Sequence, residues 1–528
     1  MAPTHGHEEI EGRYKEYAYS PVPASSTSAL YDSTALGKYP ETGAGSPKYR
    51  INGVQKCRVA EMTEKGSTIL QYAAAAAANL CSVSAGAMMG WTSPVFPRLL
   101  KVEGNPLGRP ITPDEKSWIG SLIAVGAIIG SFVAGYLAER LGRKWTLLSA
   151  AAPFLIGWIL IGTATVVPQL YVARIILGFA LSFAFTVVPM YCGEIAETSV
   201  RGALGSFLQL FVTIGLLYAY CIGPYVSYLV FWLLCAICPI AFLACFITMP
   251  ESPYYLLKVG KRTDAVNALA RLRSKSAASV QKEADEIQAA VDEAFRTEAK
   301  VTDLFTVTTN RKALLFTCLL VMFQQFSGIN VVLFYMEDIF QSARSSLPSA
   351  LSTIIVGAVQ TGSSAVTPVI VDKLNRKTLL VFSGIGETVA LIALGIHLFL
   401  QDRGSDMSSV AFLPILSLVI FIATYCVGWG PLAWTVMGEM FASNVKSKAS
   451  GITVCVCWLC SFFITFYCNK LQQAWGNYSL YWLFAAFCVA SVVFTIMVLP
   501  ETKGKSLQQI QNELSGKKSE IPEFESKQ

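Results

Sequence analysis

Twelve apolar runs of about 20 residues constrain this chain more than any other feature of its sequence. Their centres lie near Ser82, Ala127, Gly157, Leu181, Ile214, Cys238, Met322, Gly362, Leu391, Ile422, Cys460 and Ala490. A helix of about 20 apolar residues crosses the hydrocarbon layer of a bilayer, where the backbone must satisfy its own polar groups. We therefore expect an all-α membrane protein with twelve transmembrane helices.

Composition supports lipid as the solvent of this chain. Of 528 residues, 53% are hydrophobic and only 14% are charged, whereas soluble proteins carry roughly 25% charged residues. Such a chain would expose large apolar patches in water and aggregate. This excludes a secreted disulfide scaffold and a disordered protein, and it argues against a nucleic-acid partner.

The apolar runs fall into two groups, six before residue 250 and six after residue 311. The first 65 residues are polar and contain no cleavable signal peptide, and we expect them to be disordered. They are either simply solvated or regulated by phosphorylation. The predicted segments are a cytoplasmic N-terminal tail (1–65), a six-helix bundle (66–250), a cytoplasmic helical linker (251–312), a second six-helix bundle (313–500) and a cytoplasmic C-terminal tail (501–528).

Basic residues in the short loops indicate the orientation. With both termini in the cytoplasm, nine Lys and Arg residues lie in short inner loops and seven in outer loops, in the direction of the positive-inside rule. The only glycosylation sequon, at Asn477, then lies outside. We predict that Asn477 is glycosylated, with an unused chance sequon as the alternative.

The fourteen cysteines and three histidines do not indicate a metal site. Most of the cysteines lie inside apolar runs, where they behave as small hydrophobic residues. No metal-ligand spacing and no nucleotide motif is present. We therefore expect neither a metal nor a cofactor, and no enzyme activity.

The two halves repeat each other. The charged motif at 139–144 recurs at 372–377, and the Pro-Glu-Ser motif at 250–252 recurs as Pro-Glu-Thr at 500–502. In each half a glutamate also precedes a basic residue by seven positions. Two bundles related by a parallel repeat are typical of transporters with a substrate site between them near the midplane.

The repeated charges suggest a gate on the cytoplasmic side. Carboxylates and guanidinium groups at helix ends would pair when this side is shut and separate when the bundles rock open. The alternative is that the basic residues only determine topology. The candidate inner-gate residues are Glu139, Arg140, Arg143, Glu194, Arg201, Asp372, Arg376, Glu439 and Lys446.

Uncharged amides and tryptophans inside the spans indicate the chemistry of the substrate. Amide side chains both donate to and accept from hydroxyl groups, and an indole stacks on the apolar face of a sugar ring. The alternative is that these residues form hydrogen bonds between helices. The candidate substrate-binding residues are Gln209, Gln324, Gln325, Asn330, Gln360, Trp434 and Trp458.

From Leu70 to Leu507 the chain resembles the sugar porter family of the major facilitator superfamily. The resemblance rests on six motifs that occur in order, at 135–144, 189–202, 250–253, 324–335, 428–439 and 500–505. The stretches at 91–94 and 117–122 look most like the insect facilitated trehalose transporters, and glucose facilitators come next.

The resemblance implies the fold and the sugar contacts. Five of the candidates match sugar contacts of the family: Gln209, Gln324, Gln325, Asn330 and Trp434. Gln360 and Cys457 stand where glucose facilitators have asparagines, which puts plain glucose specificity in doubt. Asn375 replaces a family glycine and Lys446 a family arginine, and both weaken the detailed gate pairings.

The mode of transport is inferred from an absent charge. Proton coupling usually needs an ionisable group within a span, and the stretch from Gly66 to Pro97 has none. Glu387 and His397 are the candidates for coupling, with Glu387 placed near the cytoplasmic end of its span.

We therefore expect facilitated, bidirectional transport by alternating access across the plasma membrane, with trehalose preferred and glucose the runner-up. A proton-coupled symporter and a non-transporting sugar sensor are the alternatives. Sugar sensors that resemble this family differ chiefly by a long cytoplasmic C-terminal tail, whereas only 28 residues follow Pro500 here. The oligomeric state is left open.

Overall fold

The computed structural model describes residues 66–296, 300–441, 443–505 and 507–515, and every regular element within them is a helix. Twelve helical segments are long and apolar enough to cross a membrane, six ending by Phe246 and six beginning at Thr308. The predicted all-α membrane fold is thus confirmed. The predicted tail at 1–65 lies outside the described residues, as do residues 516–528.

The first bundle contains the first six spans. Its helices are α1 (Ile69–Gly90), α2 (Thr92–Leu99), α3 (Pro113–Leu141), α4 (Arg143–Ser149), α5 (Ala151–Gly162), α6 (Val167–Ile195), α7 (Arg201–Ile222), the short η2 (Gly223–Tyr225) and α8 (Tyr228–Phe246). The start of α3 is fixed by a capping box, in which Thr112 accepts from the backbone N–H of Glu115 and Glu115 accepts from that of Thr112. Such a reciprocal cap satisfies two of the helix's unpaired N–H groups.

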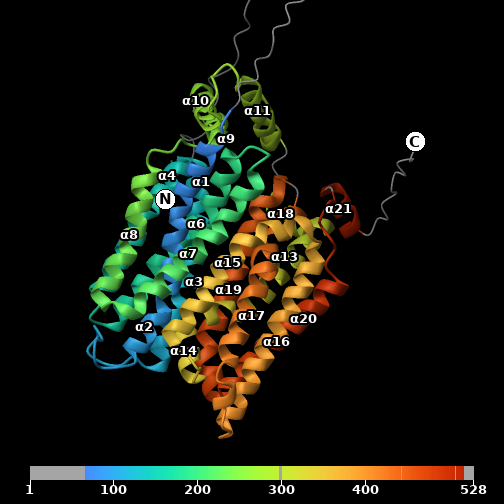
Figure 1. Cartoon of the computed structure of the whole chain (residues 1–528). Coiled ribbons are helices and arrows are strands. Elements are labelled where there is room, and N and C mark those ends of the chain that lie inside the picture. Colours follow the sequence, from blue (N-terminus) through green and yellow to red (C-terminus); the bar gives the residue numbers. More distant parts are fainter. Residues whose placement is uncertain (1–65, 297–299, 442, 506, 516–528) are drawn as a thin grey trace, which may run out of the picture. The chain divides into compact units, whose positions relative to one another are not determined.

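Four short helices connect the bundles: α9 (Pro253–Lys258), α10 (Arg262–Arg273), α11 (Gln281–Arg296) and α12 (Asp303–Thr306). They lie beyond one end of the spans, near the start of α4 and the end of α18 (Figure 1). We call this end the linker side and the other end the opposite side. Arg273 attaches the linker to the first bundle, because its buried guanidinium donates to the Ile195 carbonyl (2.8 Å) and pairs with Glu197 (3.2 Å).

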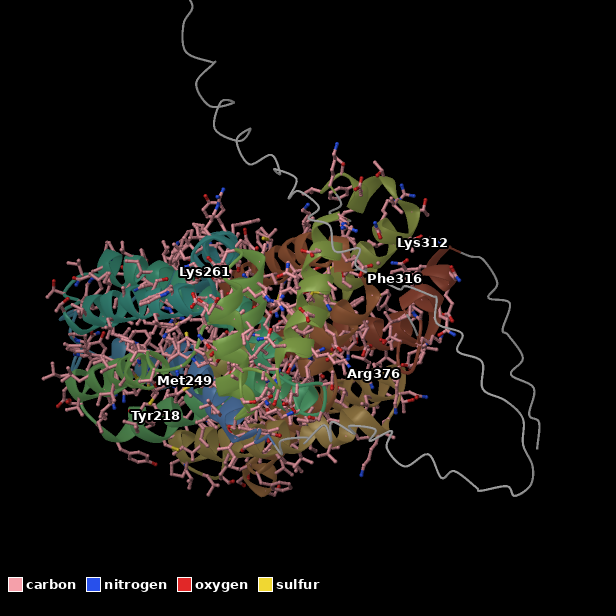
Figure 2. All side chains as sticks on the ribbon, turned by 90° about the horizontal axis from the view of Figure 1, so that it is seen from above. Tyr218, Met249, Lys261, Lys312, Phe316 and Arg376 are labelled. Carbon is pink, nitrogen blue, oxygen red and sulfur yellow. The ribbon has the colours of Figure 1, made fainter. Side chains whose placement is uncertain are left out.

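The second bundle contains the last six spans. Its helices are α13 (Thr308–Phe326), α14 (Ile329–Ser342), α15 (Ser349–Lys373), α16 (Arg376–Asp402), the short η3 (Ser408–Val410), α17 (Leu413–Val427), α18 (Trp429–Met440), α19 (Ser443–Trp475) and α20 (Asn477–Met497), followed by α21 (Leu507–Ser515). In the view along the spans, Tyr218 and Met249 lie on one side and Phe316 and Arg376 on the other (Figure 2).

Glycines allow the helices of the first bundle to cross closely. A Cβ on Gly86 of α1 would come within 2.0 Å of the Val212 carbonyl of α7, and one on Gly126 of α3 within 1.9 Å of the Ile175 carbonyl of α6. Apolar helices gain little hydrophobic free energy when they exchange contact with lipid for contact with each other. Close van der Waals packing at small residues therefore stabilises their association. The α1–α7 and α3–α6 pairs therefore form the tightly packed centre of this bundle.

The bundles meet through helix pairs that follow the internal repeat. Helix α3, the second span, packs on α19, the eleventh span, and α15, the eighth span, packs on α7, the fifth span. Helix α2 also packs on α14. These contacts leave the middle of the interface to the residues described next.

Candidate functional site

All seven predicted substrate-binding residues line one cavity between the bundles. The cavity and its open mouth together contain about 560 Å³ of empty space. Its lining consists of Met89, Phe185, Gln209, Val212, Leu216, Gln324, Gln325, Ile329, Asn330, Leu333, Gln360, Tyr425, Gly430, Trp434, Cys457 and Trp458. None of these residues is charged.

A break in the seventh span places three of the amides together. Helix α13 ends just after Gln325, and α14 begins just before Asn330. Between them Gly328 has φ +86°, in the left-handed region, and a Cβ there would lie 2.3 Å from the Phe484 ring. Only glycine adopts this conformation at no steric cost. Half-helices that meet at the midplane are a frequent arrangement at transporter binding sites.

Hydrogen bonds fix these amides relative to one another. Asn330 Nδ2 donates to Gln325 Oε1 (2.6 Å) and to Ser461 Oγ (2.8 Å), while Gln325 Nε2 donates to Cys457 Sγ (3.2 Å). Gln324 Nε2 donates to the carbonyls of Trp429 and Gly430, at 2.8 and 3.0 Å. Both of its amide hydrogens are therefore engaged, and its oxygen, which accepts a long hydrogen bond from Gln325 Nε2 (3.4 Å), can accept one more from a ligand.

Gln360 differs from Gln324, Gln325 and Asn330, the other buried amides of the cavity. Its side chain is 1% exposed, and its Oε1 atom has no hydrogen-bond partner among the residues that the structure describes. A buried acceptor without a partner costs roughly 1–3 kcal/mol. A substrate hydroxyl in the cavity would remove this cost by donating to Gln360.

Aromatic rings form another part of the lining. Trp458 of α19 meets Phe185 of α6 edge to face, with ring centroids 6.0 Å apart. This contact joins the two bundles across the cavity. Trp434 and Gln209 are half-exposed, whereas Asn330 and Leu333 are buried.

Contacts on the opposite side join the bundles beyond the cavity. Lys116 Nζ and Asp338 Oδ2 form an ion pair at 2.7 Å, and Asn469 Nδ2 donates to Ser117 Oγ at 2.9 Å. The Phe96 and Tyr335 rings stack with centroids 5.2 Å apart. We call these three contacts the seal.

The cavity communicates with the linker side. Toward that side α7 is exposed at residues 201–203 and partly exposed from 206 to 211, but beyond Val212 it is mostly buried. Three lining residues are partly exposed, Phe185, Gln209 and Trp434, and the last two lie in the parts of α7 and α18 nearer the linker side. The structure thus has an accessible cavity on the linker side and a closed seal on the opposite side.

Two ionic clamps occur at equivalent positions of the two bundles. In the first clamp Arg143 Nη2 lies 2.8 Å from Glu194 Oε1, and Ser252 Oγ donates to the other Glu194 oxygen. Glu251 accepts from the backbone N–H groups of Arg143 and Lys144, both at 3.0 Å. These bonds tie the start of α4 to the end of α6 and to the segment after α8.

The second clamp repeats this geometry in the second bundle. Arg376 Nη2 lies 3.0 Å from Glu439 Oε1, Thr502 Oγ1 donates to the other oxygen (2.5 Å), and Glu501 accepts from the Arg376 N–H (3.1 Å). The two loops differ at one position: Gly142 has φ +92°, whereas Asn375 has φ −69°. The second loop therefore does not require glycine, which explains how Asn375 is accommodated there.

Glu251 and Glu501 differ in their pKa. Burial raises the pKa of Glu251 above its usual value, and its backbone hydrogen bonds only partly offset this effect. At Glu501 burial also acts to raise the pKa, but four backbone N–H bonds together hold it below its usual value. Both glutamates belong to the repeated Pro-Glu motifs of the sequence, but neither is among the predicted gate residues.

The other predicted gate residues lie around these clamps. Glu139 pairs with Lys258 of the linker and lies 3.5 Å from Arg143, whereas Arg201 and Lys446 are exposed. The Arg140 guanidinium lies over the Tyr136 ring. The side chain of Asp372 lies outside the described residues.

The location of the two clamps does not match what the gate hypothesis expects. Each clamp joins helices of a single bundle, and both are closed although the cavity communicates with the linker side. If these ion pairs formed the cytoplasmic gate, they would be separated when the cavity is accessible from the linker side. The gate remains a prediction.

One further prediction is wrong, and the glycosylation of Asn477 stays a prediction. Glu387 lies 11 positions after Arg376 in the 27-residue α16, fully buried and hydrogen-bonded to Ser383 (2.8 Å), so its predicted place near the end of the span was wrong. Asn477 is exposed, but it is the first residue of α20, and Gly476 alone separates it from α19.

Sequence reasoning missed the apolar lining of the cavity. Met89, Phe185 and Tyr425 are ordinary residues of apolar runs, and nothing in their type separates them from residues that face lipid. Ser461 was also missed, although it follows Cys457 by one helical turn. That spacing is the signal that would have placed it on the face of α19 toward the cavity.

Comparison with known proteins identifies similar chains. Residues 54–514 match the family described as "Sugar (and other) transporter". The chain is 34% identical over 452 residues to a Culex quinquefasciatus protein named facilitated trehalose transporter Tret1, with 85% of this chain and 87% of that protein covered. It is also 34% identical over 450 residues to a protein of that name from Apis mellifera ligustica, with 85% and 88% covered.

Solved structures show a similar fold. The proton:xylose symporter XylE, bound to 6-bromo-6-deoxy-D-glucose, matches with a TM-score of 0.70 and 26% identity, covering 84% of this chain and 99% of that chain. The xylose transporter XylE from E. coli in a partially occluded inward open conformation also matches with a TM-score of 0.70, at 25% identity, with 83% and 100% covered.

Proposed function

The chain belongs to the sugar transporter family, and from this premise we propose that it is a facilitated trehalose transporter working by alternating access. One observation carries the proposal: a cavity between the bundles is lined by neutral amides and tryptophans and by no charged residue. Neutral amides suit the hydroxyls of a sugar, each of which donates and accepts. The names of the insect relatives support trehalose as the sugar.

The order of events follows from the geometry of the two sides. In this structure the sugar would enter or leave the cavity on the linker side. Transport then requires the seal to open and the linker side to close, so that the bundles rock about the bound sugar. Trp458 and Phe185 contribute from different bundles, and Gln360 offers its free oxygen, so a bound sugar would contact both halves.

We further propose that the protein lies in the plasma membrane with its linker side on the cytoplasmic face. The excess of basic residues in the short loops of this side supports the proposal. Protease added to intact cells should then leave the segment 251–312 uncut. Cleavage there without permeabilisation would reverse the orientation.

The mode of transport is tested by counterflow in membrane vesicles. Vesicles loaded with unlabelled trehalose should transiently accumulate labelled trehalose, equally at two external pH values and with a protonophore present. The reason is that none of the described residues lining the cavity is an acid, a base or a histidine, whereas proton coupling usually needs an ionisable group within a span. Glucose-loaded vesicles are the comparison.

Each outcome of the counterflow experiment decides one part of the proposal. Accumulation only with glucose would replace trehalose by glucose. Uphill uptake driven by an imposed proton gradient would make the protein a symporter and direct attention to the buried Glu387. Sugar binding without any flux would make it a sensor.

The amides of the broken span should govern the rate of uptake. Replacing Gln325 or Asn330 by alanine should slow trehalose uptake about tenfold, because one lost hydrogen bond in a buried site costs roughly 1–2 kcal/mol. Initial uptake rates, divided by the amount of protein at the surface, measure the effect.

Asn79 provides the matched control for a buried amide. It is fully buried in α1 and donates to the Ala75 carbonyl (2.8 Å), but it does not line the cavity. Asn79→Ala should change stability without a comparable change in the uptake rate per molecule. Equal rates for the Asn79 and Asn330 variants would assign Asn330 to helix packing.

A further inference from the structure

A second cavity lies on the opposite side, between the bundles. It encloses about 1,030 Å³ of empty space, again with its open mouth included. The first bundle contributes Arg98 of α2, Pro224 of η2 and Ser227, which caps the start of α8, and α14 contributes Glu337 and Gln341 from the second. The uptake mechanism described above does not use this cavity.

The polar groups of this cavity are incompletely paired. Glu337 is 9% exposed, and within the described part of the chain its Oε2 atom has no hydrogen-bond partner. Arg98 directs Nη2 to the Gly223 carbonyl (2.5 Å) and not to Glu337. A buried carboxylate oxygen without a hydrogen-bond partner is costly, and Glu337 is one of the residues that line the cavity.

The mixed charge of the cavity restricts the ligand. An anion would meet the carboxylate of Glu337, and a cation would meet Arg98 and Lys101. A neutral molecule with several hydroxyls avoids both conflicts, because each hydroxyl donates to a carboxylate or accepts from a guanidinium. The proline rings of Pro94 and Pro97 supply an apolar wall.

The cavity depends on the closed seal. Its two sides belong to different bundles, and beside it the backbone N–H of Glu337 donates to Ser93 Oγ (3.1 Å), a bond between α14 and α2. Separation of the bundles on the opposite side would move Arg98 away from Glu337. A ligand that contacts both residues therefore stabilises the conformation with the seal closed.

We propose that this cavity is a second sugar-binding site, which holds the transporter closed on the opposite side and slows its return. The proposal rests on the function proposed above, because the ligand is the transported sugar or a similar neutral polyol. Sugar present on the opposite side would then act in two ways. It enters the central cavity while the seal is open, and it occupies the second site while the seal is closed.

The test is uptake of labelled trehalose into right-side-out membrane vesicles over a wide range of external concentrations. Uptake by the unaltered protein should rise to a maximum and then fall, because the second site fills at higher concentration. When the external concentration equals the dissociation constant of the second site, half of the molecules hold sugar there, and the rate should be about half of the rate expected without that site. In trehalose-loaded vesicles, the same external concentrations should slow efflux.

Two substitutions separate the second site from the transport site. Glu337→Gln and Arg98→Gln should each abolish the fall at high concentration while leaving uptake at low concentration within about twofold of the unaltered protein. Asp406→Asn is the matched control, because Asp406 is an exposed acid of the loop before η3, and it should retain the fall. Gln341→Ala, which removes no charge, should weaken the fall and thus guards against misfolding of the charge variants.

Two results would overturn the proposal. The first is uptake by the unaltered protein that saturates without any fall. The second is a fall that persists in Glu337→Gln, Arg98→Gln and Gln341→Ala variants with normal uptake at low concentration. Failure of the proposed function looks different, because the unaltered protein would then show no trehalose uptake at any concentration.

Discussion

Replacing Arg143 by glutamine should lower the free energy of unfolding of the purified protein by about 3–5 kcal/mol. The guanidinium is 5% exposed and bonds to Glu194 through two nitrogens, at 2.8 and 3.0 Å. Glutamine would leave the Glu194 carboxylate largely buried without its counter-charge. Removal of one partner of a buried pair is costly for this reason. The midpoint of thermal unfolding in detergent, followed by size-exclusion chromatography, measures the change.

The repeat supplies graded controls for this substitution. Arg376→Gln should cost less, because Arg376 and Glu439 are 13% and 28% exposed in their side chains. Arg201→Gln, at an exposed position of the same side, should cost almost nothing. The double variant Arg143→Gln with Glu194→Gln should recover part of the loss, because no charge is then buried alone.

These measurements also decide between a clamp and a gate. A clamp within one bundle predicts that Arg143→Gln lowers stability while uptake per folded molecule changes little. Unchanged stability together with slower uptake would support the predicted gate. If neither quantity changes, the basic residues serve membrane topology alone.

Gly328→Ala should abolish uptake or prevent accumulation of folded protein. Alanine costs about 1–2 kcal/mol in the left-handed region, and a Cβ 2.3 Å from the Phe484 ring forces a rearrangement of roughly 1–3 kcal/mol more. The backbone that holds Gln325 and Asn330 together would have to move. Uptake per surface molecule and the amount of monodisperse protein report the two effects.

Two other glycines separate the causes. Gly404 has φ +80° with open space around its Cβ position, so Gly404→Ala carries the conformational cost alone. Gly362 lies in α15 with open space and an ordinary helical φ, so Gly362→Ala should be tolerated. Equal behaviour of the three variants would contradict a special role for the break at Gly328.

Much of the architecture was predictable because lipid imposes simple rules. Backbone polar groups must be satisfied within each span, so apolar runs alone located the twelve spans. The same rule made amides such as Gln325 and Asn330 conspicuous, because a buried amide in a bilayer needs a partner. These two residues were therefore found from the sequence, and the structure places both in the cavity.

Other features depend on distances that residue types do not encode. Glu251 bonds to backbone N–H groups at the start of α4, more than 100 positions earlier in the chain. Sequence indicated that charges recur but not which partner each one contacts. For the same reason, the pairing within each bundle and the side toward which the cavity opens could only be read from packed helices.

The location of the first clamp has a consequence for biosynthesis. Its members, Arg143, Glu194, Glu251 and Ser252, all precede α9, the first helix of the linker. Domains generally fold as units, the N-terminal one first, while the ribosome is still adding residues. The first six spans can therefore lock together in the membrane before the seventh span has been translated, and the nascent chain then offers the later spans a finished surface on which to assemble.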